Sequence, residues 1–291
     1  MAVETHNYAS MNAGWKILMW RIRRKILRLY GGLDLSKFKY MGKIVAIGGG
    51  EIGRAGYYVE TMEIDQEIVR LTGKKKPKLL FIPTASSDAL GYVEDVNRHF
   101  GGSLGCEVDV LLLSREKLSK KMMTEKIMGA DVIYVGGGNT LLLMKTWRKL
   151  GVDKIFEQAY RKGIVMAGVS AGSICWFRDG LSDSVRKVED GKAGYIKVSG
   201  LGYIRALHCP HYDYEKERLP ALEKKMQKTS GVAIALENCA ALEVIDDEYR
   251  IITSHSDAKA YKIFFTKGEY HKREIEETKE YRPLRELLAK I

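Results

Sequence analysis

The sequence predicts an α/β fold built on a parallel sheet, and three observations lead to this prediction. Short apolar runs with many β-branched residues alternate with helical stretches between residues 43 and 167. Runs that are apolar throughout indicate strands buried on both faces, as in a parallel sheet covered by helices. Four of these runs end in turns rich in glycine, serine or threonine, and ligands bind at that edge of an open α/β sheet. Later apolar runs are joined by a short acidic turn, which predicts an antiparallel edge.

The expected elements follow in chain order. Buried strands are predicted over Lys43–Ile47, Lys78–Ile82, Glu107–Leu113, Asp131–Val135 and Ile164–Ala167. Helices are predicted between them, for example over Tyr92–Phe100, Arg115–Met128 and Thr140–Lys149. Strand-like runs return at Val232–Leu236, Ala240–Ile245, Tyr249–Thr253 and Tyr261–Thr266, and a helix over Arg282–Ala289 closes the chain. Residues 41–291 are therefore predicted to form one domain, with Asp246-Asp247-Glu248 as a hairpin turn at its antiparallel edge.

The first forty residues differ in character from the rest of the chain. Apolar residues recur at helical spacing between Trp15 and Tyr30, and the same segment carries six basic residues and no acid. Residues 1–40 are therefore predicted to be a basic amphipathic extension. Such a helix packs on its own protein, mediates self-association or lies on an anionic membrane. We expect packing, or association into a homo-oligomer, rather than contact with a membrane.

Net charge and cysteine usage narrow the class of protein. The 291 residues carry a net charge of +11, but no helix-turn-helix, RNA-binding or zinc-finger pattern accompanies the charge, so no nucleic-acid partner is predicted. No apolar run approaches the length that spans a bilayer, and the N-terminus lacks the order of a secretory signal. The four cysteines form no C-x-x-C pair and lie in or beside apolar segments, which predicts buried reduced thiols. These features favour a cytoplasmic globular protein.

The most informative stretch is Ile164–Phe177, which reads IVMAGVSAGSICWF. Gly168-Val169-Ser170-Ala171-Gly172 is a G-x-S-x-G pentapeptide between a predicted strand and an apolar run with helical spacing. This pattern is typical of a nucleophile elbow, in which a serine is held on a strained turn with its hydroxyl exposed. Glycines two residues before and after the serine are expected because side chains there would collide where strand turns into helix. The pattern predicts a serine hydrolase.

Two further glycine-rich turns follow predicted strands. Gly136-Gly137-Gly138-Asn139-Thr140 can supply a backbone N–H to an oxyanion hole, together with the N–H of Ala171. The same turn can instead be a phosphate cradle or a helix capped by Asn139. Gly48–Gly53 satisfies G-x-G-x-x-G, so an NAD(P)-binding enzyme is an alternative, although no acid ends the second strand as a dinucleotide site requires. The other interpretation of this turn is a glycine-rich loop beside the active site.

A serine nucleophile needs a base and a group that orients the base. Among the six histidines, His208 and His211 lie in a stretch, ALHCPHYD, that joins an apolar run to a loop. Pro210 fixes a non-helical approach to His211, which suits an imidazole at the end of a strand. Cys209 between them allows a metal interpretation, but further ligands at zinc spacing are missing. The candidate orienting acids are Asp183, Asp213 and Glu237, and the residues alone do not choose among them.

Several motifs together resemble the peptidase E (aspartyl dipeptidase) family of serine peptidases, which also contains cyanophycinase. The similarity covers Gly42 to Ala241 and includes PKLLFIPTAS, VGGGNT, AGVSAGS, CPHYD and ALEN in this order. It implies a flavodoxin-like sandwich with a parallel sheet, related to class I glutamine amidotransferases. It also implies a Ser-His-Glu triad of Ser170, His211 and Glu237, with Asp183 as the alternative acid. Gly137 and Ala171 are the implied oxyanion donors.

The resemblance also implies the substrate class. The family's named substrates are dipeptides with N-terminal aspartate, or the aspartyl-arginine polymer cyanophycin, and no cofactor or metal is needed. Asn139 and Arg218 are the predicted substrate-binding residues. Arg218 is chosen because, in aspartyl dipeptidases, an arginine that binds the substrate carboxylate follows the catalytic histidine at a helical position. The expected activity is hydrolysis of a peptide or isopeptide bond next to an aspartyl residue in a small peptide. The alternatives are a catalytically silent binding or regulatory member of this fold and the NAD(P)-binding enzyme.

Overall fold

The computed structural model of the chain describes residues 42–185, 194–214 and 217–291. The basic extension predicted over residues 1–40 lies outside the described residues, so its boundary and its role stay predictions. Within the described part, the order of strands and helices alternates from β1 to β5, as the sequence predicts. No helix in this part of the chain is both long enough and apolar enough to cross a membrane.

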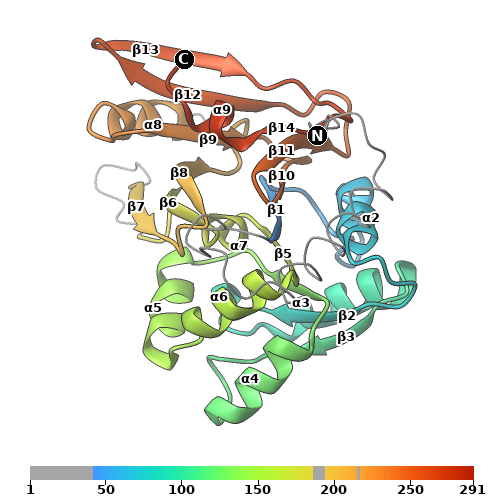
Figure 1. Cartoon of the computed structure of the whole chain (residues 1–291). Helices are drawn as coiled ribbons and strands as arrows, with labels where there is room; N and C mark the ends of the chain where they lie inside the picture. The colour runs from blue at the N-terminus through green and yellow to red at the C-terminus, as the bar shows by residue number, and fades with distance from the viewer. Residues whose placement is uncertain (1–41, 186–193, 215–216) are drawn as a thin grey trace, which may run out of the picture. The chain divides into compact units, whose positions relative to one another are not determined.

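The first sheet has eight strands in the order β14-β11-β10-β1-β5-β4-β2-β3 (Figure 1). Its parallel strands are β1 (Lys43–Ile47), β2 (Lys78–Ile82), β3 (Glu107–Val110), β4 (Val132–Val135) and β5 (Val165–Val169). Its antiparallel edge consists of β10 (Ala240–Ile245), β11 (Glu248–Thr253) and β14 (Arg282–Pro283). The α/β fold with a parallel sheet and an antiparallel edge is therefore confirmed, and Asp246 turns the predicted hairpin with a φ of 58°.

Helices pack against this sheet and bury its strands. They are α2 (Met62–Leu71), α3 (Leu90–Val96), α4 (Lys120–Gly129), α5 (Thr140–Leu150) and α6 (Asp153–Lys162), and α9 (Leu284–Leu288) lies near the C-terminus. Apolar residues of α2 and of the π-helical turn at Asn97–Ser103 join the core on one face of β1, β2, β4 and β5. An aromatic cluster of Trp147, Phe156 and Trp176 joins α5, α6 and the segment after β5. Burial of β1, β2, β4 and β5 explains why their sequences are apolar throughout.

A second sheet was not predicted. It has six strands in the order β13-β12-β9-β8-β6-β7. They are β6 (Phe177–Ser182), β7 (Ile196–Ser199), β8 (Ile204–Cys209), β9 (Val232–Leu236), β12 (Ala260–Thr266) and β13 (Glu269–Glu274). The predicted runs at residues 232–236 and 261–266 are thus strands of this sheet and not of the first one. Helix α8 (Arg218–Met226) packs on it through Leu222 and Met226.

The turn after β5 has the geometry that the glycines around Ser170 predict. Ser170 has a φ of 57° and a ψ of −114°, and the short helix α7 (Ala171–Ile174) begins directly after it. A Cβ on Gly172 would lie 2.0 Å from the carbonyl oxygen of Val135, and a Cβ on Gly168 would lie 2.4 Å from that of Gly172. Both glycines are therefore required by close backbone approach, because nothing larger fits where α7 passes the ends of β4 and β5.

Replacing Gly172 by alanine is expected to destabilise the protein by roughly 1–3 kcal/mol or more, because the added methyl group collides with a backbone carbonyl that cannot move freely. Urea denaturation of the wild-type protein and the variant measures the difference. Gly91→Ala is the matched control, since this helical glycine has open space around its Cβ position. Equal stability of the two variants would contradict the close packing of the turn.

Candidate active site

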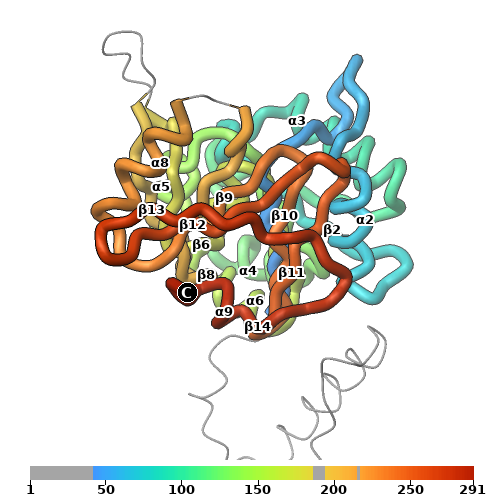
Figure 2. The backbone as a smooth tube through the Cα atoms, turned by 90° about the horizontal axis from the view of Figure 1, so that it is seen from above, coloured from blue at the N-terminus to red at the C-terminus, as the bar shows by residue number. Residues whose placement is uncertain are grey.

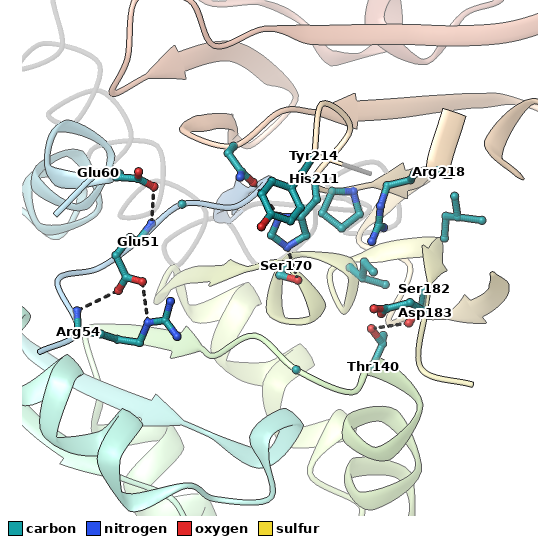
Figure 3. Close-up of a pocket in the computed structure, with 16 residues that line it drawn as sticks. Glu51, Arg54, Glu60, Thr140, Ser170, Ser182, Asp183, His211, Tyr214 and Arg218 are labelled. Carbon is teal, nitrogen blue, oxygen red and sulfur yellow. Dashed lines mark hydrogen bonds and ion pairs between the residues drawn. The ribbon is translucent and has the colours of Figure 1, made fainter. Parts of the chain in front are cut away.

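The candidate active site lies where loops from both sheets meet (Figure 3). Gly50, Gly138 and Ser170 follow β1, β4 and β5 of the first sheet, and His211 and Asn238 follow β8 and β9 of the second. Backbone hydrogen bonds join these loops, with His211 N–H donating to Gly48 O and Cys239 N–H donating to Gly49 O. A single pocket of about 400 Å³ is lined by Gly50, Gly138, Ser170, His211 and Asn238.

Ser170 and His211 form the central pair. Nε2 of His211 lies 2.9 Å from Oγ of Ser170, and Nδ1 lies 2.7 Å from Oδ1 of Asn238. Because an amide oxygen only accepts, Nδ1 carries the proton and Nε2 is left to accept the proton of the serine hydroxyl. The imidazole packs directly on backbone, since a Cβ on Gly49 would lie 2.4 Å from Nδ1. The structure thus brings together a hydroxyl, a base in the correct tautomer and an orienting group.

The structure places Asn238, and not the predicted Glu237, against Nδ1 of His211. The carboxylate of Glu237 accepts hydrogen bonds from the N–H of Lys259 at 2.9 Å and from the hydroxyl of Tyr261 at 3.2 Å. Partial burial raises the pKa of this carboxyl, and the two hydrogen bonds oppose the rise. After β9 ends at Leu236, Glu237 therefore faces β12 of its own sheet and the next residue faces His211. This is a correction of the predicted Ser-His-Glu arrangement.

The other two candidate acids, Asp213 and Asp183, lie near the site and do not contact His211 Nδ1. Asp213 accepts a hydrogen bond from the backbone N–H of Asn238 at 3.0 Å, so it supports the residue that contacts His211. Asp183 lines the pocket beside Ser182 and Thr140, on the side away from Glu51 and Glu60 (Figure 3). The Nδ1 contact of His211 thus goes to neither carboxylate.

Arg218 lies in the pocket, as the sequence predicts for a substrate-binding residue. It is the first residue of α8, it is only 3% exposed, and its guanidinium lies over the ring of Tyr195 at 5.0 Å. Two hydroxyl groups share this side of the pocket, since Ser182 Oγ donates to Thr140 Oγ1 at 3.1 Å. This side of the pocket therefore combines a buried cation with two hydroxyl groups and the carboxylate of Asp183, and Arg218 is the group on it that suits a carboxylate ligand.

Asn139 has a structural role instead. Its Oδ1 accepts from the N–H of Leu142 at 2.8 Å and its Nδ2 donates to the carbonyl of Ser184 at 3.2 Å. It is therefore the N-cap of α5, which is the alternative interpretation of this turn, and its neighbours Gly138 and Thr140 line the pocket in its place.

The predicted oxyanion donor Gly137 lies beside Ser170, since a Cβ on it would lie 3.9 Å from Ser170 Oγ. Its N–H donates to the hydroxyl oxygen of Tyr92 at 3.3 Å, and burial raises the pKa of that phenol to about 12. The next residue of the same turn, Gly138, lines the pocket. Tyr92 comes from α3 and packs edge-on against Phe81 of β2, and no motif in the sequence pointed to it as a site residue.

The loop after β1 borders the pocket opposite Arg218. The carboxylate of Glu51 accepts from the N–H of Arg54 at 2.9 Å and from its Nε–H at 2.6 Å, and Glu60 accepts from the N–H of Glu51. An antiparallel bridge between Ile52 and Val59 closes the loop, which projects from the body in Figure 2. Helix α2 starts only at Met62, so Gly48–Gly53 does not open into a helix as a dinucleotide-binding turn does.

His208, the second candidate base, is buried beneath the site. Its Nδ1 lies 3.0 Å from the carbonyl oxygen of Ile234 and its Nε2 lies 2.8 Å from Oγ of Ser173. These contacts use both ring nitrogens and do not suit the metal interpretation. No group of three or more histidine, cysteine, aspartate or glutamate side chains in the described residues is placed to hold a metal ion. All four cysteines are buried and none forms a disulfide bond, which agrees with the prediction of reduced thiols.

Comparison with known proteins decides the family. Residues 44–252 match the model of Peptidase family S51. The chain belongs to this family. The matched segment runs from β1 into β11, so it contains Ser170, His211 and Asn238, and the family predicted from the sequence motifs is confirmed. This S51 member is therefore a peptidase.

Individual relatives agree with the family. The uncharacterized peptidase YgaJ of Bacillus subtilis (strain 168) is 36% identical over 233 residues, which cover 79% of this chain and 95% of the relative. The uncharacterized peptidase Lmo0363 of Listeria monocytogenes is 34% identical over 95 residues, 32% of this chain and 45% of the relative. The crystal structure of a peptidase from an acI-B1 Actinobacterium covers 84% of this chain and 97% of its own, with a TM-score of 0.63 and 20% identity, and shows the same fold.

Asn238→Ala is expected to lower kcat on the order of 10²- to 10⁴-fold, because His211 loses the acceptor that fixes its tautomer and orientation. Glu237→Gln, which removes a charge one residue away, is expected to keep kcat near that of the wild type. Steady-state kinetics on one peptide substrate compares the two variants. An inactive Glu237→Gln beside an active Asn238→Ala would restore the acid predicted from the sequence.

Proposed function

We propose that this S51 peptidase is a serine peptidase that cleaves a peptide or isopeptide bond next to an aspartyl residue through an acyl-enzyme on Ser170. The observation that carries the proposal is the 2.9 Å contact between Ser170 Oγ and His211 Nε2 on the wall of a pocket. A hydroxyl, a base within hydrogen-bond reach and a third group on the base are the parts that activate a serine nucleophile.

The proposed reaction proceeds in two halves. Nε2 of His211 takes the proton of Ser170, and the serine oxygen attacks the carbonyl carbon of the scissile bond. His211 then gives this proton to the leaving amine as the tetrahedral intermediate collapses to the acyl-enzyme. Water, deprotonated by the same nitrogen, hydrolyses the ester and returns the serine. The N–H of Ala171 and an N–H from the turn at Gly138 are the proposed donors to the negatively charged oxygen.

The proposed aspartyl preference depends on Arg218 and its surroundings. A guanidinium that is 3% exposed binds a carboxylate more strongly than an exposed one, since little water competes for it. The hydroxyls of Thr140 and Ser182 on the same side add neutral hydrogen-bonding groups. A substrate side chain that ends in a carboxylate, held there beside Ser170, would place its backbone carbonyl at the nucleophile.

Ser170→Ala is expected to abolish hydrolysis and to leave the fold intact, because the hydroxyl is the nucleophile and its loss opens little space. Release of amino acids from a set of dipeptides that vary the N-terminal residue measures activity, and labelling of the wild-type protein by a serine-directed phosphonate identifies the residue. A variant that still turns over substrate would refute the nucleophile. A wild-type protein that is neither labelled nor active would be the catalytically silent member of the fold.

Arg218→Gln is expected to reduce the preference for aspartyl over asparaginyl dipeptides by about 10- to 100-fold in kcat/KM, the range for one hydrogen bond to a charged group. Arg218→Lys keeps the charge and is expected to retain part of the preference. Thermal unfolding of both variants checks that the buried position tolerates the change. A wild-type protein that cleaves both dipeptides equally well would contradict the aspartyl assignment and leave the serine mechanism standing.

A further inference from the structure

The peptide group that joins Ser170 to Ala171 consists of the carbonyl of Ser170 and the N–H of Ala171. Its N–H is the proposed oxyanion donor, and its carbonyl oxygen faces α7. That oxygen accepts hydrogen bonds from Ser173 N–H at 3.0 Å and from Ile174 N–H at 3.0 Å, and Ser173 Oγ lies 2.7 Å from it. Hydrogen bonds to a carbonyl polarise the whole peptide group and make its N–H a stronger donor. The side chain of Ser173 therefore acts on the donor at the far end of the same peptide group.

A buried histidine holds the hydroxyl of Ser173. His208 and Ser173 are both fully buried, and His208 Nε2 lies 2.8 Å from Ser173 Oγ. The imidazole is fixed from two further directions, since it stacks on Phe177 at 4.4 Å and contacts Ile234 O through Nδ1 at 3.0 Å. Ser173 is thus tied to β8 and β9 of the second sheet, while the carbonyl that it contacts belongs to the turn after β5.

The three contacts that link Ile234 O, His208, Ser173 Oγ and Ser170 O have only two protons between them. Burial lowers the pKa of His208 to about 3, so the imidazole is neutral and carries one proton. The hydroxyl of Ser173 supplies a second. Both ends of the chain, the carbonyls of Ile234 and Ser170, only accept, so three contacts share two protons. The proton of Ser173 therefore has two competing acceptors, His208 Nε2 and Ser170 O.

We propose that Ser173 is a positioning residue for the oxyanion donor and that His208 acts through it. As negative charge forms at the N–H of Ala171, the carbonyl oxygen of the same peptide becomes the better acceptor, and the hydroxyl of Ser173 turns its proton to it. The interaction is then stronger in the transition state than in the ground state, which is the condition for raising kcat. The inference rests on the proposed function, because it needs Ser170 as the nucleophile.

Ser173→Ala is expected to lower kcat about three- to tenfold, the effect of one neutral hydrogen bond, with KM unchanged. It is expected to weaken binding of a peptide aldehyde, which forms a tetrahedral adduct with a serine, by a similar factor and to leave product binding unchanged. Ser173→Cys, with a weaker donor of similar shape, is expected to fall between. His208→Gln in the Ser173→Ala background is expected to cost nothing further.

Cys175→Ala is the matched control. Its thiol donates to the carbonyl of Gly172 at 3.0 Å, so it also loses a buried donor to a carbonyl three residues earlier in the same short stretch. That carbonyl belongs to the peptide of Ser173 N–H, which donates to Ser170 O, so the weak thiol donor acts on the oxyanion donor through one further peptide group and is expected to affect it less than Ser173 does. Thermal unfolding midpoints show whether the two variants are equally folded.

Equal kcat and equal aldehyde affinity in Ser173→Ala and Cys175→Ala would overturn the inference. So would an increase in KM with kcat unchanged, or further loss on adding His208→Gln. If Ser173→Ala does not fold, the Ser173→Cys comparison decides on the same criteria. Ser170→Ala separates the two levels: turnover in that variant refutes the proposed function, whereas its inactivity, combined with a Ser173→Ala that behaves like the control, refutes only the role of Ser173.

Discussion

The left-handed backbone of Ser170 is the constraint on which the rest of the site depends. A serine in this conformation costs of order 1–3 kcal/mol, and it persists only where the surroundings determine it. Here the N–H of Ser170 donates to Ile47 O of β1 and its carbonyl accepts from α7. Gly168 and Gly172 let the turn press against β4 without a side chain between them. The central strands of the first sheet therefore hold the serine hydroxyl at their carboxyl edge.

His211 contacts the neutral side chain of Asn238, and the carboxylate of Asp213 contacts Asn238. In a serine–histidine–acid arrangement the carboxylate contacts the histidine directly. Asn238 offers His211 a neutral oxygen, as the asparagine of papain-like peptidases does, and the negative charge of Asp213 reaches the histidine only through the N–H of Asn238. A neutral partner fixes the tautomer as well as a carboxylate does, but it attracts the imidazolium less. The carboxylate of Asp213, which accepts from the backbone N–H of Asn238, is the nearby group that can supply part of that attraction.

The sequence was sufficient for strands that are mostly apolar, and β1, β2, β9 and β10 begin and end where it predicts. It failed for β6, because Arg178, Asp179 and Gly180 resemble a loop, although most of this strand is buried in the second sheet. In the site, Ser170, His211 and Arg218 could be predicted from motifs. Glu237 and Asn238 could not be told apart, because neighbouring side chains after a strand point in opposite directions and only the tertiary structure shows which one meets His211.

The proposed nucleophile and the proposed base follow strands of different sheets, so their contact depends on how the two sheets pack together. Ser170 follows β5 and His211 follows β8, and the hydrogen bonds between Gly48, Gly49, His211 and Cys239 join the two sheets. A fluctuation that separates the sheets by one ångström leaves every strand intact and yet breaks a 2.9 Å contact. Turnover by the proposed pair would therefore depend on the docking of the two sheets as well as on the integrity of each one.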